Sequence, residues 1–208
     1  VLWIGAGEIG KAIVRRIASG HRIVVGDKRP ENARRAADEL SNIGFDVRPV
    51  DCDLSDRASV CAAVAEAQSY GAIEYLVNSA GVSPSQASSE TILKVDLYGT
   101  AVLLEEVGKV IARGGAGVTV SSQSGHRMPA LTAREDELLA TTPTEKLLAL
   151  DMLQPQNIRD TLHAYQLAKR CNVKRVMAEA VRWGERGARI NSISPGIIVT
   201  PLAIDEFN

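Results

Sequence analysis

The sequence predicts one α/β domain built on a doubly wound parallel sheet, with helices on both faces. Short apolar runs alternate with segments of helical spacing, which is the order of successive β-α-β units. The apolar runs are mostly continuous, as in strands that are buried on both faces. A glycine-rich turn follows the first run and opens the first helical segment. These three observations agree on the same fold class.

Composition suits a globular domain and excludes some classes of partner. The 208 residues are 45% hydrophobic and 24% charged, enough to bury a core. A net charge of −1 and 4% aromatic residues argue against a nucleic-acid partner, and no apolar run is long enough to cross a membrane. The three cysteines are widely spaced without a CxxC pair, so we expect no disulfide framework, no metal and a reducing, cytoplasmic location. Because Val1 already lies in a strand-like run, we expect the native start to lie upstream.

The first half of the chain is expected to form four strands that alternate with helices. Apolar runs predict strands over residues 1–4, 22–25, 47–50 and 73–77. Helical spacing predicts helices over residues 11–19, 30–41 and 55–69. Ser55 is the expected N-cap of the third helix, because a serine side chain can accept a hydrogen bond from a free N–H of the first turn.

The second half continues this order with longer helices. Helices are expected over residues 90–112 and 157–183, and Gly114 with Gly115 is expected to close the first of them. Strands are expected over residues 118–121 and 189–193, which completes a parallel sheet of six strands.

A long segment, residues 125–163, breaks this rhythm. Two capping boxes predict short helices inside it, one at residues 132–135 and one at residues 142–145 with proline at its first helical position. Connections of this length are often lids or binding elements. We therefore expect a helical insertion, residues 126–163, that shapes or covers a pocket or contacts a neighbouring subunit, with a packed surface decoration as the alternative.

The first turn carries the GxGxxG pattern of Rossmann-type nucleotide-binding folds, between a strand and a helix as that pattern requires. The first glycine permits a tight turn, the second lets a pyrophosphate approach the backbone, and the third lets the helix pack close to the strand. The free N–H groups of the helix N-terminus attract phosphate. The pattern consists of Gly5, Ala6, Gly7, Glu8, Ile9 and Gly10.

An acidic residue after the second strand bears on which nucleotide would bind. The Asp27 carboxylate is placed to accept hydrogen bonds from ribose hydroxyls and to repel a 2′-phosphate, which favours NAD over NADP. Lys28 and Arg29 follow and are able to pair with that phosphate, so NADP stays possible. A methyltransferase that binds S-adenosylmethionine would show a similar glycine loop and acidic residue, so this part of the chain does not separate the two classes.

Residues with catalytic potential follow the later strands. Tyr165 and Lys169 are four residues apart on a predicted helix, which places the phenol and the ammonium on one face. Ser122 follows the fifth predicted strand, and open α/β sheets bind ligands at the carboxyl ends of their strands. Polar segments over residues 78–81 and 194–200 follow the fourth and sixth strands. The sequence therefore predicts that these groups gather at one edge of the sheet.

Together these motifs make the chain resemble the short-chain dehydrogenase/reductase family over its full length, and they occur in that family's order. The resemblance implies an oxidoreductase that transfers hydride between NAD, or NADP, and a small secondary alcohol or ketone. It also implies cofactor contacts beyond the glycine loop and Asp27, by Asp53, Leu54, Asn78, Ala80, Gly81, Lys169, Pro195, Gly196, Ile198 and Thr200.

The resemblance implies catalytic roles as well. Tyr165 would exchange a proton with the substrate oxygen, Ser122 would orient that oxygen, and Lys169 would favour the phenolate and hold the nicotinamide ribose. Ser122 is preferred over Ser121 and Ser124, because the family's serine lies three residues before a glycine.

Three features depart from the family pattern. Asp96 stands where the family often has an asparagine that holds a proton-relay water, so it is either a proton-passing group near Lys169 or a salt-bridged structural residue. Ser122 and Tyr165 are separated by the long insertion, where the family has a short segment. The family usually continues with a substrate-covering helix and a seventh strand, which we expect to be missing here.

The resemblance implies a homodimer or homotetramer formed through the helix of residues 157–183. Residues that suit such a face, and suit packing inside the chain equally, are Ala164, Leu167, Ala168, Val176 and Ala180. Two other functions stay open: a dinucleotide-binding regulator without catalysis, and a methyltransferase, which would leave Tyr165 and Lys169 without a role. A nucleotide-sugar epimerase shares the Tyr-Lys pair but usually needs a larger carboxyl-terminal domain.

Overall fold

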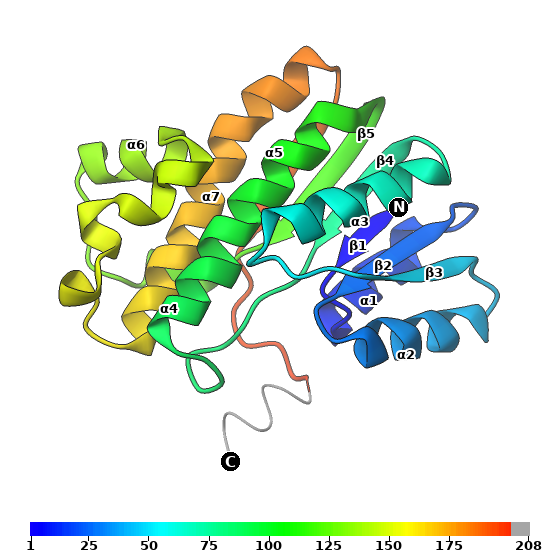
Figure 1. Cartoon of the computed structure of the whole chain (residues 1–208), viewed down its shortest axis with the longest axis horizontal. Helices are drawn as coiled ribbons and strands as arrows, with labels where there is room; N and C mark the ends of the chain where they lie inside the picture. Colours follow the sequence, from blue (N-terminus) through cyan, green and yellow to red (C-terminus); the bar gives the residue numbers. More distant parts are fainter. Residues whose placement is uncertain (201–208) are drawn as a thin grey trace.

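Six parallel strands form the sheet in the order β3-β2-β1-β4-β5-β6, so the predicted doubly wound fold is confirmed. The computed structural model describes residues 1–200. The chain winds outward from β1 to β3, returns to β4 beside β1, and winds outward again to β6 (Figure 1). The strands are β1 (Leu2–Ile4), β2 (Ile23–Asp27), β3 (Val47–Asp51), β4 (Ile73–Asn78), β5 (Ile111–Val120) and β6 (Arg189–Ile193). The winding reverses between β1 and β4, and such a reversal is where open sheets bind their ligands.

Helices cover both faces of the sheet, with α1 and α2 on one face and α3, α5 and α7 on the other (Figure 1). Leu2 and Ile4 of β1 pack beneath α3, α5 and α7, whereas Trp3 packs on the side of α1 and α2. Both faces of the strand are therefore buried, as its continuous apolar run predicts. The helices are α1 (Glu8–Ile17), α2 (Pro30–Ser41), α3 (Arg57–Ser69), α4 (Ser89–Ile92), α5 (Thr100–Val110), α6 (Ala133–Thr141) and α7 (Thr161–Glu185).

The cap predicted for α3 is wrong by one residue. The N-cap is Asp56, whose carboxylate accepts a hydrogen bond from the Ala58 N–H at 2.9 Å. The Ser55 hydroxyl instead donates to Asp53 at 2.6 Å. Aspartate and serine are equally good N-caps, so two adjacent candidates left the start of the helix undecided in the sequence.

The helix predicted over residues 90–112 is confirmed as far as Val110, but its C-terminal end is wrong, because a strand starts at Ile111. A π-helical segment, η1 (Leu93–Gly99), separates α4 from α5. β5 begins at Ile111 and pairs with β4 through a register shift, and Gly114 and Gly115 lie inside this strand rather than closing a helix. A run of β-branched apolar residues fits a helix end and a buried strand equally, so its pattern did not place the boundary.

The insertion is a chain of short helices. It contains α6 and three 3₁₀ turns, η3 (Thr144–Ala149), η4 (Asp151–Leu153) and η5 (Pro155–Asn157), and a further 3₁₀ turn, η2 (Gln123–His126), leads into it. The capping box at Thr132 is confirmed, because its hydroxyl and the Glu135 side chain bond to each other's main-chain N–H groups. The second capping box is wrong: Thr142 is the C-cap of α6, no side chain caps η3, and Glu145 pairs with Arg57 of α3. Thr144 donates a hydrogen bond to Glu105 of α5 at 2.7 Å. α7 likewise starts at Thr161, later than predicted, with Asp160 as its N-cap.

The insertion is part of the core rather than a loose cover. Leu139, Leu147 and Leu153 are at most 3% exposed and form a third apolar cluster with η1 and α7. Four of the residues suggested for a subunit face are buried inside the chain. For these four, packing within the chain is confirmed rather than contact with another subunit. They are Ala164, Leu167 and Ala168 in this third cluster and Val176 in the core beneath the helices.

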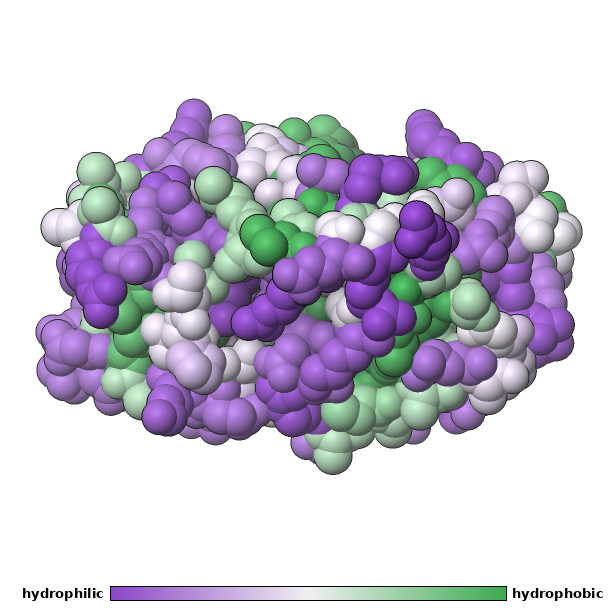
Figure 2. Space-filling view, turned by 90° about the horizontal axis from the view of Figure 1, so that it is seen from above, coloured by the Kyte–Doolittle hydropathy of each residue, from purple (hydrophilic) through white to green (hydrophobic). Residues whose placement is uncertain are grey.

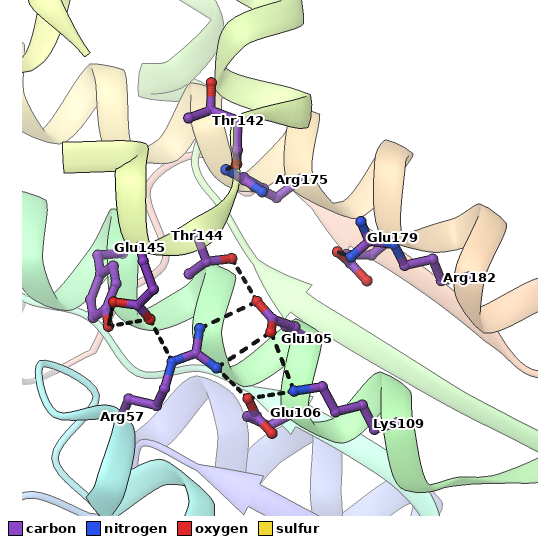
Figure 3. A network of polar contacts seen from close by, with 11 residues as sticks. Arg57, Glu105, Glu106, Lys109, Thr142, Thr144, Glu145, Arg175, Glu179 and Arg182 are labelled. Carbon is purple, nitrogen blue, oxygen red and sulfur yellow. Dashed lines mark hydrogen bonds and ion pairs between the residues drawn. The ribbon is translucent and has the colours of Figure 1, made fainter. Parts of the chain in front are cut away.

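Polar contacts tie the insertion to α3 and α5 (Figure 3). Arg57 of α3 forms ion pairs with Glu145 of the insertion at 2.6 Å, with Glu105 at 3.3 Å and with Glu106. Glu145 also accepts a hydrogen bond from the Tyr98 hydroxyl at 3.1 Å. Because these groups are partly exposed, each pair contributes little alone, and the buried leucines supply most of the attachment.

The outer surface is mainly polar on the face shown in Figure 2, where hydrophobic residues form small separate areas among hydrophilic ones. Within residues 1–200, no helix is long and apolar enough to cross a membrane.

Candidate active site

The loop after β1 and the loop after β4 touch at the reversal of the sheet. Gly5 has φ +87°, a conformation that side chains disfavour, and a Cβ there would lie 2.3 Å from the main-chain nitrogen of Ala80. The Ser79 hydroxyl donates to the Gly5 carbonyl at 2.8 Å and accepts from the Trp3 indole at 3.0 Å. Only glycine fits at position 5, and it brings the two loops into direct contact.

The N-terminus of α1 is open and suits a phosphate group. Gly7 is the N-cap, no side chain caps this end of the helix, and a Cβ on Gly7 would meet nothing within 4 Å. Glu8 is exposed and Ile9 is half-buried, whereas Gly10 is buried against Trp3. The first N–H groups of a ten-residue helix are therefore accessible, and they carry the positive end of its dipole. These residues fit the pyrophosphate of a dinucleotide.

Asp27 lies directly beside this loop. One carboxylate oxygen accepts a hydrogen bond from the Ala6 N–H and the other from the Arg29 N–H, both at 3.0 Å. Lys28, which the sequence left as a partner for a 2′-phosphate, forms an ion pair with Asp53 at 2.9 Å. Partial burial opposes the charge of Asp53, but hydrogen bonds from Ser55 and Lys28 outweigh it and hold its pKa below the ordinary value. Asp27 and Asp53 therefore lie at this end of the candidate site together with Lys28 and with Arg29, which is exposed.

Two of the predicted cofactor residues have their side chains in the core. Leu54 is 3% exposed and packs beneath the helices. Asn78 is 1% exposed, and its amide donates to the Thr100 hydroxyl at 3.3 Å. These two side chains support the loops from within, so any contact they make with a ligand runs through the main chain.

A buried ion pair lies beneath the loop that follows β4. The Lys169 Nζ and the Asp96 Oδ2 are 3.0 Å apart, with side-chain exposures of 5% and 0%. Burial alone would lower the pKa of the Lys169 ammonium, but the Asp96 carboxylate and the Tyr165 phenol raise it above its ordinary value. Burial likewise raises the pKa of Asp96, against the opposing effect of Lys169. The sequence left two roles open for Asp96, and the structure places it in direct contact with the lysine.

Tyr165 lies one turn before Lys169 on α7, at the edge of the third apolar cluster. Its ring centroid is 5.2 Å from the Lys169 Nζ, and the residue is half-buried. Partly buried apolar residues pack on the same cluster, among them Val82 of the β4 loop and Met128, Leu131 and Ile158 of the insertion. The insertion and Tyr165 therefore pack on the same apolar cluster.

The three serines after β5 differ in what they bind. Ser121 is 3% exposed and donates to the main-chain oxygen of Lys169 at 2.7 Å. Ser122 is half-buried, and its hydroxyl accepts from the Ser124 N–H at 3.1 Å. A Cβ on Gly125 would lie 2.7 Å from the α7 backbone, so this loop packs tightly on the helix that carries Tyr165. Ser121 holds the loop to α7, while the half-buried Ser122 is the N-cap of η2.

The loop after β6 runs beside the serine loop. The Gln123 N–H donates to the Pro195 carbonyl at 2.8 Å, and the His126 ring bonds to the Ser194 hydroxyl at 3.0 Å. Gly196 and Ile198 are exposed, and Thr200 is half-buried. The loops after β1, β4, β5 and β6 therefore gather at one edge of the sheet, as the motif order predicts.

Sequence reasoning missed two positions at this edge. Asn172 is 1% exposed, and its amide donates to the main-chain oxygen of Asp96 at 2.8 Å. The Ser79 hydroxyl links the loops after β1 and β4. Asn172 lies three residues after Lys169, on the same helix face, so helical spacing is a signal that could have found it.

The edge of the sheet and its loops define a dinucleotide-binding class of α/β fold, and comparison with known proteins identifies the family. Residues 1–133 match the family model for short chain dehydrogenases. A short-chain dehydrogenase/reductase, bsc3, from Alternaria brassicicola is 38% identical over 96% of this chain and 73% of its own length. A D-threitol dehydrogenase from Mycolicibacterium smegmatis is 33% identical over 95% of this chain and 68% of its own length.

The comparison of structures agrees in fold. A short-chain dehydrogenase/reductase from Serratia marcescens superposes with a TM-score of 0.72 at 22% identity, over 97% of this chain and 76% of that one. The chain belongs to the short-chain dehydrogenase/reductase family, whose members are oxidoreductases that use NAD or NADP with small alcohol or ketone substrates.

Proposed function

We propose that this chain transfers hydride between NAD and a small secondary alcohol or ketone, with Ser122, Tyr165 and Lys169 as its catalytic side chains. The observation that carries this proposal is the position of Tyr165, half-buried and 5.2 Å from a buried lysine, on a helix packed against the Ser122 loop. Family membership supports the class of reaction.

Each proposed side chain acts on a stated atom. The Tyr165 hydroxyl gives its proton to the carbonyl oxygen during reduction and takes it back during oxidation. The Ser122 hydroxyl donates a hydrogen bond to the same oxygen and fixes its direction. The Lys169 ammonium attracts the phenolate that forms and binds ribose hydroxyls. The nicotinamide, when bound, supplies or accepts the hydride.

The cofactor would bind across the reversal of the sheet. We assign the pyrophosphate to the N-terminus of α1, the adenosine ribose to Asp27, and the adenine end to Asp53 and Leu54. Further main-chain and side-chain contacts are assigned to Gly5, Gly7, Glu8, Ile9, Gly10, Asn78, Ala80, Gly81, Pro195, Gly196, Ile198 and Thr200. Preference for NAD over NADP is supported by Asp27 beside the glycine loop and by the pairing of Lys28 with Asp53.

The setting of the enzyme is part of the proposal. The three cysteines are unpaired, which supports a reducing, cytoplasmic location. Self-association as a homodimer or homotetramer is retained from the family resemblance. The D-threitol dehydrogenase among the relatives has, by its name, a polyol substrate, so linear polyols belong in a first substrate panel.

The test is direct titration of the protein with NADH and NADPH, followed by fluorescence. We expect NADH to bind more tightly than NADPH, and Asp27→Ala to narrow that difference. Tyr165→Phe is expected to abolish turnover of a secondary alcohol while NADH affinity stays within about twofold. If neither nucleotide binds, the dehydrogenase function fails. Tight nucleotide binding without turnover of any alcohol or ketone would favour the non-catalytic regulator, and binding of S-adenosylmethionine alone would favour the methyltransferase.

A further inference from the structure

We propose that Asp96 is a positioning residue that keeps the buried Lys169 side chain charged and fixed beneath the loop after β4. This role belongs to the protein without nucleotide. The role has a consequence for catalysis: turnover should depend on the ion pair between Asp96 and Lys169. This consequence rests on the proposed function.

The pair lies in a place that water does not reach. The Asp96 side chain is fully buried and that of Lys169 nearly so, while their charged atoms are 3.0 Å apart. A Cβ on the exposed Gly81 would lie 2.9 Å from the Asp96 Oδ2 and 3.1 Å from the Lys169 Nζ. The main chain at Gly81 therefore covers the ion pair. Because glycine lacks a side chain, no side chain at this position separates the ion pair from the candidate site. A lone ammonium at this depth would lack both solvent and a counter-ion.

Three contacts fix the position of Asp96, two of them to its carboxylate. Asp96 belongs to the π-helical segment η1, and such segments displace residues from ordinary helical positions. Its Oδ1 accepts a hydrogen bond from the Val82 N–H at 2.8 Å, which leaves Oδ2 for the lysine. The Asn172 amide bonds to the main-chain oxygen of Asp96 at 2.8 Å and joins η1 to α7. The carboxylate is thus held by the loop after β4 and by α7 together.

Within the described part of the chain, no other charged group competes for Lys169. Asp96 forms the ion pair, and the Tyr165 ring on the same helix is the other titratable group nearby. The charged side chains on neighbouring elements have other partners: Glu90 with Lys94, Asp136 with Arg170 and Lys174, Glu179 with Arg182, and His126 with Ser194. The charge state of Lys169 therefore depends on one carboxylate.

Removal of the Asp96 carboxylate should lower the pKa of Lys169. Burial favours the neutral amine of a lysine, and in the wild type the Asp96 carboxylate opposes this effect. Asp96→Asn keeps the size of the side chain and removes the charge, so Lys169 should lose its proton at a lower pH. Acidification then restores the ammonium, which a defect of packing would not allow.

The first test follows Lys169 directly, in protein without nucleotide. NMR of ¹³C-labelled lysine side chains gives its titration, with the signal assigned by its loss in Lys169→Met. We expect the midpoint in Asp96→Asn to lie at least about two pH units below that of the wild type. The matched control is Asp136→Asn, which removes a carboxylate paired with Arg170 and Lys174 on the same helix and should leave the Lys169 midpoint unchanged. An equal midpoint in Asp96→Asn and wild type would overturn the proposal.

The second test covers the case in which Asp96→Asn unfolds. A double variant with Lys169→Met carries neither charge, and we expect it to be more stable to urea than Asp96→Asn alone, because the uncompensated ammonium is gone. A double variant that is no more stable would overturn the proposal. This measurement needs no cofactor or substrate.

The third test is the pH profile of ketone reduction. We expect the turnover of Asp96→Asn, relative to wild type, to fall by up to about tenfold per pH unit as the pH is raised above the Lys169 midpoint found by NMR, and to recover below that midpoint, as protonation of one group requires. A deficit that is the same at every pH would assign Asp96 a purely structural role and overturn the proposal. If wild type itself binds no reduced nucleotide, the proposed function fails, and the NMR titration still decides the role of Asp96.

Discussion

Replacement of Gly7 by alanine separates nucleotide binding from folding. Gly7 has φ −89° and ψ 174°, which alanine adopts without strain, and the new Cβ would meet nothing within 4 Å. Alanine is a poorer N-cap than glycine by about 0.5–1 kcal/mol, and the reduced freedom of the unfolded chain returns about 0.4–1 kcal/mol. We therefore expect the free energy of unfolding to stay within about 1 kcal/mol of the wild-type value.

The binding of NADH should change far more. The added methyl group occupies the space beside the first N–H groups of α1, where a phosphate must approach to accept their hydrogen bonds. Loss of one hydrogen bond to a charged group costs about 1.5–3 kcal/mol, which raises the Kd at least about tenfold. Fluorescence titration with NADH measures this change, and urea unfolding checks that the variant is intact.

Gly10→Ala is the matched control in the same loop. A Cβ there would lie 2.1 Å from both the Trp3 Nε1 and the Ser79 Oγ, so it collides with packed groups. Overpacking of this kind costs about 1–3 kcal/mol, and the loss should appear in urea unfolding. If Gly7→Ala is as stable as wild type and binds NADH with unchanged affinity, the assignment of the pyrophosphate to α1 is refuted.

Three further predictions concern the core and the insertion. Leu147→Ala should lower the free energy of unfolding by about 2–5 kcal/mol, because Leu147 is fully buried. The control, Leu162→Ala at an exposed position, should lower it by less than about 0.5 kcal/mol. Equal effects of the two substitutions in urea unfolding would mean that the insertion lies outside the cooperative core. At pH 8, iodoacetamide should label Cys61 alone by mass spectrometry, because burial raises the pKa of the other two thiols to about 12. Partial burial opposes the charge of Glu105, but Thr144 and nearby cations outweigh it and lower its pKa from 4.5 to about 2. Because the pKa of Glu105 is lower in the folded state, its contribution to the free energy of unfolding is present above pH 4.5 and lost as the pH falls toward 2. We expect Thr144→Val to reduce the loss of unfolding free energy between pH 5 and pH 3. An unchanged pH dependence would contradict the assignment of this pKa shift to Thr144.

The sheet and its loops could be predicted because their signals are local. Strands buried on both faces give continuous apolar runs, and the glycine loop must contain glycine where the backbone takes φ +87° beside Ala80. The second capping box failed for the opposite reason. Glu145, the acidic partner of that box, forms an ion pair with Arg57 of α3, and a sequence pattern does not reveal a contact between distant residues.

The position of Asp96 shows where sequence reasoning stops. Helical spacing brings Tyr165 and Lys169 together without any tertiary information. The pairing of Asp96 with Lys169 depends on the π-helical turn of η1 and on the main chain at Val82, neither of which has a sequence signature. The resemblance placed Asp96 near the lysine and left open a proton-passing role and a structural salt bridge; the structure shows an ion pair with Lys169, which is compatible with both.

The insertion shares its apolar core with the helix that carries Tyr165. Its leucines share one apolar cluster with α7, and Tyr165 packs at the edge of that cluster. Deletion of the insertion would expose this cluster to water at a cost of about 1.5–3 kcal/mol for each buried leucine, so a deletion variant would report on folding before it reported on substrate choice. Point substitutions at the partly buried Met128, Leu131 or Ile158 leave Leu139, Leu147 and Leu153 in place. Because Tyr165 packs on the same cluster, we expect substitutions at these positions to change the relative kcat/KM for different alcohols more than the stability to urea.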